Sequence, residues 1–473
     1  MIKRATIFAF TLLLAILNIH AQYQFIDEAL EFTPAPGQFI NIPPWGMPES
    51  AQSIVGTING SLSLGAWGGY VVFRFEEAVQ NHPDNPFGVD FIIFGNPLQT
   101  WSEPGTVWVM KDENGNGVPD GTWYQLAGSD YYFSSTIRNY SVTYFNPGTE
   151  EASDVPWIDS EGNEGVIPAN SVQTQNYYPR HDIFPHIPAG EFTFNGIRIE
   201  GSLDKTNPAF IQSYRRAFGY ADNVPRGTAP FNVPNNPYTR TVENAGGDGF
   251  DISWAVDEDG NYVDLDEIHF IKVQTGMLGE GGWMGEVSTE VTGALVVEPN
   301  PGITGVLDMV VIKDLPPLVD QNPYPLEAYA FHRGRVQPEK NILWTADIDG
   351  AYVDNEGSLH FDVSGTLTLT AYLEENSDIY DVVTTTLEYS PTNTHIVEQN
   401  PFKVYPIPAS GFIHVESHGQ AFVKLFDLQG RVVREFMHTG GVKRVSLSGV
   451  LPGVYLMVLN NEQKIYQTKI MVK

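Results

Sequence analysis

Short runs of alternating apolar and polar residues, separated by Gly, Pro, Asn and Asp, most limit how this chain can fold. Examples are "YVVFRF" (70–75), "DFIIFG" (90–95), "TVWVM" (106–110), "FTFNGIRIEG" (192–201) and "IHFIKVQTG" (268–276). A period of two residues is typical of half-buried antiparallel strands, and helical periodicity is nearly absent. The sequence therefore predicts an all-β protein, with a jelly-roll-like sandwich domain over residues 22–299.

Two further sandwiches are expected after this body. "VEPNPGITG" (297–305) has the composition of a boundary, and residues 300–390 contain a Trp-bearing strand and the alternating run "GTLTLTAYL". This segment resembles the immunoglobulin-like domains of bacterial surface proteins, and the resemblance implies a spacer. Residues 391–399 are expected to be a linker. Residues 400–473, with short strands and tight turns, are expected to form a small third β-sandwich.

The N-terminus predicts export. Lys3 and Arg4 precede an apolar run that is too short to span a bilayer comfortably, and Ala21 is a small residue at an expected cleavage point. This pattern is typical of a secretory signal peptide, here residues 1–21. No later stretch reads as a transmembrane segment, so none is expected in the mature chain. The absence of Cys excludes disulfides, thiolate metal sites and a lipid-modified N-terminal Cys.

The chain is strongly acidic, and the charge is unevenly distributed. The formal net charge is −31, and residues 5–399 carry 15 Lys and Arg against 53 Asp and Glu, whereas residues 400–473 carry nine against four. Such a body repels phosphates and anionic membrane surfaces, so we expect no nucleic-acid partner. It suits cations, neutral sugars or basic partners. Acidity also keeps an exported protein soluble, which is the alternative explanation.

The C-terminal segment carries motifs in a fixed order: "VYPIPAS" (404–410), "LFDLQGRVV" (425–433), "LPGVYLMVL" (451–459) and the basic end "KIMVK". Together they resemble the C-terminal sorting domain of type IX secretion cargo, with Ile407 where that family usually has Asn. The resemblance implies export by the type IX secretion machinery and a secreted or outer-surface location. The sorting-signal residues that it implies are Tyr405, Pro406, Pro408, Gly453, Tyr455 and Lys473.

"KDENGNGVPDGTWY" (111–124) is rich in oxygen ligands of the kind that calcium prefers. Counted from Asp112, it follows the 12-residue calcium loop as far as position 9. Position 12 is Trp123 rather than an acidic residue, so the loop is not an EF-hand, and Glu103 before the incoming strand is the candidate for the missing carboxylate. The expected calcium ligands are Asp112, Asn114, Asn116, Val118 (through its backbone carbonyl), Asp120 and Glu103.

A hairpin loop without metal is the alternative, because Gly, Asn and Asp are also favoured in turns. A second acidic turn, "VDEDGNYVDLDE" (256–267), carries four Asp residues. Its Asp-Gly pair favours a hairpin over a metal site. Those four residues are Asp257, Asp259, Asp264 and Asp266.

Aromatic residues gather around the 111–124 stretch. Trp123 and Tyr124 lie within it, and Trp283 lies in the Gly-rich "GEGGWMGE" (279–286). Aromatic rings beside acidic and amide groups suit sugar faces or a flat macrocycle, so these three are the expected ligand contacts. "DFIIFGN", "SEPGTVW" and "GEVSTEVTGA" also resemble a group of bacterial cell-surface proteins, and this resemblance implies binding more than catalysis.

Three functions remain open from the sequence. The first is a secreted or surface-attached protein that binds a glycan or a cobamide-like ligand with calcium-supported loops. The second is a polysaccharide hydrolase that uses loop carboxylates, and the third is an adhesive or structural surface protein. Motifs for nucleotide binding, zinc proteolysis and serine hydrolysis are absent from the sequence.

Overall fold

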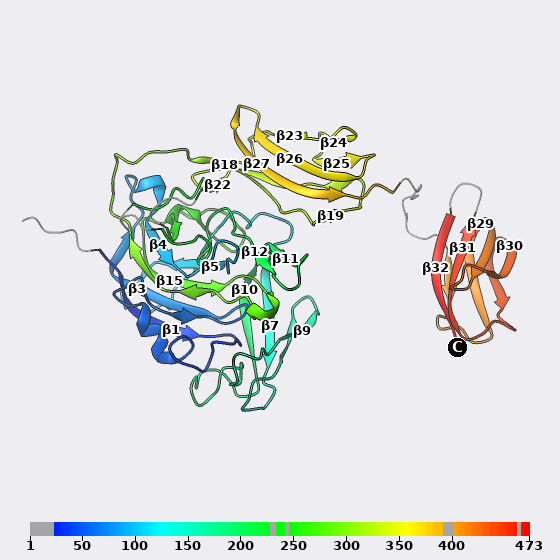
Figure 1. Cartoon of the computed structure of the whole chain (residues 1–473), viewed down its shortest axis with the longest axis horizontal. Helices are drawn as coiled ribbons and strands as arrows, with labels where there is room; N and C mark the ends of the chain where they lie inside the picture. Colours follow the sequence, from blue (N-terminus) through cyan, green and yellow to red (C-terminus); the bar gives the residue numbers. More distant parts are fainter. Residues whose placement is uncertain (1–22, 228–232, 240, 242–245, 391–401, 461–464) are drawn as a thin grey trace, which may run out of the picture. The chain divides into compact units, whose positions relative to one another are not determined.

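The computed structural model describes residues 23–227, 233–239, 241, 246–390, 402–460 and 465–473. The chain divides into two compact units, Met1–Tyr389 and Ser390–Lys473, each described here by itself (Figure 1). The described residues are almost entirely strands and loops, which confirms the all-β prediction. The predicted signal peptide (1–21) and linker (391–399) lie outside the described residues.

The body is organised around an antiparallel sheet of six strands (Figure 1). Alternation divides its central strands into two faces, as the sequence predicts. One face is fully buried in the main core and carries Val71, Phe73, Val107, Val109, Ile271 and Val273. In spatial order the strands are β1 (Ile26–Thr33), β3 (Tyr70–Gln80), β15 (Glu267–Thr275), β5 (Gly105–Met110), β6 (Tyr124–Leu126) and β14 (Ala255–Val256).

Smaller sheets cover the same core. A four-stranded sheet contributes Tyr140, Val142 and Phe194, and a three-stranded sheet contributes Phe91 and others. The first sheet is β10 (Glu191–Arg198), β7 (Ile137–Phe145), β8 (Val155–Asp159) and β9 (Glu164–Ile167). The second is β13 (Asp248–Phe250), β4 (Phe91–Phe94) and β17 (Gly293–Val296), and the short pairs are β2 (Leu62–Ser63) with β16 (Glu290–Val291) and β11 (Leu203–Asp204) with β12 (Gln212–Ser213). The described part of the body also contains four short 3₁₀ helices: η1 (Pro48–Ile54), η2 (Pro86–Gly88), η3 (Ile252–Trp254) and η4 (Gly282–Met284).

Residues 308–389 form the expected second sandwich, but it is continuous with the body. The sheet of β18 (Asp308–Ile312), β21 (Ala328–His332) and β22 (Arg335–Val336) is shared. Met309 and Val311 on β18 belong to the body's core, whereas Val310 and Ile312 belong to a core of the sandwich. The remaining strands are β19 (Leu318–Val319), β20 (Tyr324–Pro325), β23 (Ile342–Ala346), β24 (Ala351–Val353), β25 (Ser358–Phe361), β26 (Gly365–Leu373) and β27 (Asn376–Leu387).

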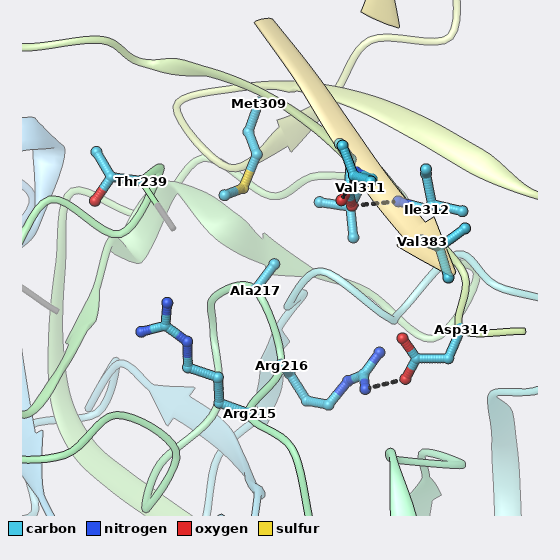
Figure 2. Close-up of a pocket in the computed structure, with 11 residues that line it drawn as sticks. Arg215, Arg216, Ala217, Thr239, Met309, Val311, Ile312, Asp314 and Val383 are labelled. Atoms are coloured by element: carbon cyan, nitrogen blue, oxygen red, sulfur yellow. Dashed lines mark hydrogen bonds and ion pairs between the residues drawn. The ribbon is translucent and has the colours of Figure 1, made fainter. Parts of the chain in front are cut away.

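A buried ion network reinforces this junction. The Arg216 Nε donates to Asp130 Oδ2 at 2.6 Å within the body, and its Nη1 donates to Asp314 Oδ2 at 2.5 Å just beyond β18. Figure 2 shows Arg216 reaching Asp314 beside a hollow of about 100 Å³. Because Arg216 is buried and both carboxylates face it, the contact fixes the sandwich to the body. The segment is therefore part of one unit rather than a freely hinged spacer.

The second unit is a five-stranded antiparallel domain with its own apolar core (Figure 1). Ile413, Val423, Met457 and Ile470 are among its buried residues. Its strands are β28 (Lys403–Tyr405), β29 (Phe412–Phe426), β30 (Val432–Ser446), β31 (Gly453–Asn460) and β32 (Ile465–Val472). This matches the small C-terminal sandwich that the sequence predicts.

Candidate functional site

The outer face of the six-stranded sheet is the candidate binding surface. Strand register sets one row across it: Lys272 on β15 pairs with Val72 on β3 and with Trp108 on β5, and Trp108 pairs with Gln125 on β6. The residues that alternate with these fill the core, so the row faces the other way. A lysine, a tryptophan and an amide thus stand side by side on one face.

Three aromatic rings surround the ammonium group of Lys272. Its Nζ lies 4.6 Å from the ring centroid of Trp108, 5.2 Å from that of Trp123 and 5.9 Å from that of Tyr70. Burial among these rings lowers the pKa of Lys272 to about 8. Distances of this size allow a cation–π attraction, which offsets part of the cost of burying the charge.

Two adjoining hollows over this face form what we call the aromatic groove. They have volumes of about 670 Å³ and 310 Å³ and share Trp123, Asn195 and Lys272. Besides these three, the groove is lined by residues that include Trp108, Gln125, Tyr131, Arg138, Tyr140, Asp257 and Glu258 in the larger hollow, and by Glu31, Tyr70, Phe192 and Gln274 in the smaller. Aromatic walls with a few polar groups are typical of small-molecule and oligosaccharide sites.

Several buried polar atoms of the groove lack hydrogen-bond partners. They are Gln125 Oε1, Gln274 Oε1 and Trp108 Nε1. The Gln274 amide nitrogen is held by the carbonyls of Gly68 and Asn195, so its oxygen has a fixed direction. Gln125 is 3% exposed and Gln274 is 2% exposed. Since buried polar atoms are normally paired, these atoms are suited to water or to the hydroxyl groups of a ligand.

The 112–120 loop follows β5 and has the compact shape expected of a calcium loop. Asp112 Oδ1 accepts from the backbone N–H of Gly115 at 2.8 Å, and Oδ2 accepts from that of Gly117 at 2.8 Å. The side-chain amides of Asn114 and Asn116 both donate to Asp120. The Gly117 hydrogen bond is the main reason that the pKa of Asp112 is lowered. The loop thus gathers these side chains at the surface.

Glu103 does not join this loop. It precedes β5, whereas the loop follows β5, so the two lie at opposite ends of a six-residue strand. Glu103 is buried instead with Asp222 and Glu290, in what we call the carboxylate cluster: one oxygen from each side chain lies within 4.8 Å of the others. The expectation that Glu103 completes the 112–120 loop is therefore corrected.

Hydrogen bonds from the backbone fix the carboxylate cluster. Glu103 Oε1 accepts from the N–H of Ser288 at 2.9 Å, and Asp222 Oδ2 accepts from the N–H of Glu290 at 2.9 Å. Asp222 Oδ1 accepts from the N–H of Asn96. Gly95 is required here, because a Cβ at that position would lie 2.1 Å from Asp222 Oδ1. Three segments that are distant in sequence therefore meet at this point.

Burial raises the pKa of all three carboxyl groups of the cluster. The charges of Glu290 and Asp222 raise the pKa of Glu103 further. Among the described residues, no basic side chain pairs with any of the three. Carboxylates in this arrangement must share protons or bind a cation, because like charges in a dry interior repel.

The other predicted ligand contacts fall in different places. Trp123 lines both hollows of the groove. Tyr124 is the next residue, and the alternation of β6 packs it against the core. Trp283 lies on η4 with 62% of its side chain exposed, and it does not line the groove. The structure therefore brings only one of the three predicted aromatic contacts to this surface.

The acidic turn at 256–267 is a hairpin turn. Asp257 Oδ1 accepts from the N–H groups of Asp259 and Asn261, and Gly260 adopts a φ of +85°. The same Asp-x-x-Gly turn recurs at Asp159, Asp354 and Asp427. Asp264 and Asp266 do not share this turn, and Asp266 pairs with Lys111 at 2.6 Å. Turn chemistry explains this stretch without a metal.

Sequence reasoning missed Lys272, Gln125, Asp222 and Glu290. Lys272 and Gln125 do leave a signal, because polar residues interrupt apolar runs at positions that face away from the core. Asp222 and Glu290 leave little signal in their own segments. Their meeting depends on the fold, which brings together residues 68 or more positions apart.

The second unit holds the predicted sorting residues on the strands and at their ends. Tyr405 ends β28 and is 41% exposed, and Pro406 and Pro408 follow it. Gly453 begins β31, and the buried Tyr455 donates its hydroxyl hydrogen to the carbonyl of Leu451 at 2.7 Å. The backbone N–H of Lys473 donates to the carbonyl of Ala409 at 2.9 Å, which closes the end of the chain onto the "PIPAS" segment.

The model of the family described as "secretion system C-terminal sorting domain" matches residues 403–473. The tail is a type IX secretion sorting domain. The protein is therefore a secreted or cell-surface protein and a cargo of that secretion machinery. Within the part of the chain that the structure describes, no helix is long and apolar enough to cross a membrane.

This family match lies within the second unit and does not extend over the body. A search of curated proteins finds none that matches the chain. Similar solved structures include domains 4 and 5 of the S-layer protein SbsC (12% identity, 35% of this chain, 96% of that chain, TM-score 0.15). Another is the Escherichia coli adhesin FdeC (8% identity, 44% of this chain, 78% of that chain, TM-score 0.15). A third is Drosophila OTK extracellular domains 3–5 (15% identity, 45% of this chain, 82% of that chain, TM-score 0.15). With TM-scores below 0.5, these likenesses carry no functional argument.

Proposed function

We propose that this exported protein binds glycans in the aromatic groove of its body. One observation carries the proposal: half-buried tryptophans and unpartnered buried amide oxygens line two adjoining hollows over one face of a sheet. Sugar rings present an apolar face that packs on aromatic rings, and their hydroxyls pair with amides and carboxylates. Since the sheet fixes these groups in advance, little side-chain ordering is required on binding.

Binding is better supported than hydrolysis. A glycosidase needs two carboxyl groups flanking the scissile bond, usually with the pKa of one raised so that it acts as an acid. The carboxylates that line the groove are Glu31, Asp257 and Glu258. Asp257 is committed to its turn, and its pKa is lowered by hydrogen bonds from Asn261. The members of the carboxylate cluster are absent from the described lining.

The test is a binding screen with the full mature chain. Soluble polysaccharides, including neutral, uronic-acid and sulfated ones, and a cobamide are presented to the wild type and to Trp123→Ala. Trp283→Ala is the matched control, because Trp283 is exposed outside the groove. We expect retention on at least one glycan that Trp123→Ala weakens at least about tenfold and Trp283→Ala leaves unchanged.

Other outcomes point to the alternatives. Capture of the cobamide alone would replace the glycan by a flat macrocycle. Release of new reducing ends during incubation would favour the hydrolase. Binding that Trp123→Ala leaves intact, or no binding at all, would contradict the groove as the functional site and would favour an adhesive or structural role.

We propose calcium as the structural partner of the body, at two places that differ in exposure. The carboxylate cluster offers three carboxylate oxygens within 4.8 Å, and the 112–120 loop offers two carboxylates and two amide oxygens on a tight turn. Both donor sets fit a hard cation with oxygen ligands. Calcium would cancel the repulsion inside the cluster and hold the end of β5 that adjoins Trp123.

A further inference from the structure

We propose that the aromatic groove selects an anionic sugar, with Lys272 as the group that recognises its negative charge. This inference rests on the proposed function and adds the charge class of the ligand. Acidic sugars carry either a carboxylate, as in uronic acids, or a sulfate. Both present an anion that a lysine ammonium group can bind by a charge-assisted hydrogen bond.

Lys272 differs from the other lysines of the first unit in that it has no ion pair among the described residues. Among the described residues of that unit there are five lysines. Four of them pair with carboxylates: Lys111 with Asp266, Lys205 with Glu280, Lys313 with Glu327 and Lys340 with Glu375. Among the described residues Lys272 has no carboxylate partner, and its ammonium group lies against three aromatic rings instead. In a chain with 57 acidic residues, this is unusual and needs an explanation.

A second cation lies in the same groove. Arg138 on β7 lines the larger hollow and stacks over Tyr131, with its Cζ 4.6 Å from the ring centroid. Among the described residues Arg138 forms no ion pair either. The groove therefore contains two basic side chains whose charges are not cancelled by direct pairing.

Two of the three acidic groups that line the groove accept hydrogen bonds from groups other than Lys272. Glu31 on β1 is the carboxylate whose charge acts on Lys272, and it accepts hydrogen bonds from the hydroxyls of Tyr70 and Thr33. Asp257 is held in its turn by the N–H groups of Asp259 and Asn261. Glu258 is the remaining acidic residue of the lining. Because the acidic body repels anions at long range, selection of an anionic sugar depends on short-range contact with the Lys272 ammonium group, which none of these carboxylates pairs with directly.

Burying Lys272 without a partner weakens the folded protein, which is why a ligand role is the better explanation. Desolvation by its surroundings lowers the pKa of Lys272 to about 8, so the charged form is disfavoured by its site. A methionine would pack against the same rings without that cost. An anion placed next to Nζ would restore the favourable environment for the charge.

The experiment titrates the full mature chain with matched ligands. Oligogalacturonate is compared with its neutral methyl ester, with a neutral mannan oligosaccharide and with a sulfated oligosaccharide of similar length, by isothermal titration calorimetry. The variants are Lys272→Met, which keeps the stem, and Trp123→Ala, which removes a wall. Lys205→Met is the control, because Lys205 is an exposed lysine outside the groove.

The expected result is binding of the carboxylated or the sulfated ligand at least about tenfold tighter than of the neutral ones. Lys272→Met should remove that preference, and Lys205→Met should not. The carboxylated and sulfated arms identify which anion is preferred. If neutral sugars bind as well as anionic ones, and Trp123→Ala but not Lys272→Met weakens them, glycan binding stands and the charge selectivity is overturned. If no ligand depends on Trp123, both proposals fail.

Discussion

Lys272 and the carboxylate cluster set the same electrostatic problem with opposite signs. Lys272 places a cation among aromatic rings without an anion, and Glu103, Asp222 and Glu290 place three carboxyl groups together without a cation. The first lies in a groove and the second is enclosed. Each therefore points to a ligand of opposite charge: one that exchanges with solvent in the groove, and one that stays bound in the interior.

In the 112–120 loop of the same protein, the carboxylates accept hydrogen bonds instead of facing one another in the interior. Asp112 accepts hydrogen bonds from the loop backbone, which lower its pKa, and Asp120 accepts from the side-chain amides of Asn114 and Asn116. The carboxyl groups of the cluster have raised pKa values because burial and mutual repulsion dominate. Similar residue types thus meet opposite environments, and under the calcium proposal the enclosed site would gain more from a bound cation.

The largest expected effect is the loss of calcium-dependent stability when the carboxylate cluster is altered. In the wild type, free calcium at about 1,000 times Kd adds about 4 kcal/mol to the free energy of unfolding. Glu290→Gln removes one charged ligand, so most of that gain should be lost. In chelator the same variant should be no less stable than the wild type, because it relieves repulsion. Thermal unfolding of the full chain in both conditions measures this, and equal calcium gains in both proteins would refute the enclosed site.

The pH dependence of stability in chelator is expected to have two limbs. Burial raises the pKa of Glu286 and of Asp248 to about 8. It also raises the pKa values of the three carboxyl groups of the cluster. In this pH range the folded state therefore binds more protons than the unfolded state. Stability should therefore rise as pH falls from about 8 towards about 5. Below about pH 4 it should fall again, because Asp112 and others with lowered pKa values become protonated.

Denaturant unfolding at a series of pH values checks this second prediction. Saturating calcium should remove the part of the upper limb that comes from the carboxylate cluster, since the bound cation replaces its protons, and should leave the part that comes from Glu286 and Asp248. A stability that declines steadily from pH 8 to pH 5 in chelator would show that these carboxyl groups do not carry an electrostatic penalty.

Lys272→Met is expected to stabilise the protein while it removes anion selectivity. At pH 7 the wild-type lysine is protonated in a site that lowers its pKa to about 8, and removing the charge should add about 1–2 kcal/mol. Because the pKa of Lys272 is lower in the folded state than in the unfolded state, the stability of the wild type should rise between about pH 8 and pH 10, and the variant should lack this rise. Guanidinium unfolding of both proteins is the measurement, and a destabilised variant would argue for a structural role of the ammonium group.

The smallest expected effect is that of Asp112→Asn. Asn has one acceptor oxygen, so it keeps either the bond from Gly117 or those from Gly115 and Asn116. The bonds from the Asn114 and Asn116 amides to Asp120 do not involve the replaced group. We expect a small loss of stability in chelator and a reduced calcium gain that leaves the contribution of the cluster intact. Calcium titration of this variant beside Glu290→Gln resolves the two sites, and loss of all calcium binding in Asp112→Asn would reverse their ranking.

The sequence predicts the sheets better than the sites. Alternation in "TVWVM" and "IHFIKVQTG" correctly separates Val107 and Ile271, which fill the core, from Trp108 and Lys272 on the other face. The sorting tail is confirmed because its motifs are local and ordered. The loop at 112–120 is likewise local, so its shape is predictable, although its binding of calcium stays a prediction.

Contacts between distant segments are what the sequence does not reveal. Glu103 was placed with Asp112 by proximity in the chain, but a strand carries them to opposite ends. Its actual neighbours, Asp222 and Glu290, lie in other segments and meet it only in the folded core. Tyr124 does not line the groove for a simpler reason: it begins β6 on the side that packs against the core, whereas Trp123, just before the strand, lines both hollows.

The most direct measurement of the central claim is the binding isotherm of the full chain with the best glycan from the screen, for the wild type and Trp123→Ala. The account predicts saturable binding by the wild type and an affinity at least about tenfold lower for the variant, with thermal stability in calcium unchanged. Equal affinities in the two proteins would contradict the aromatic groove as the site where this surface protein meets its ligand.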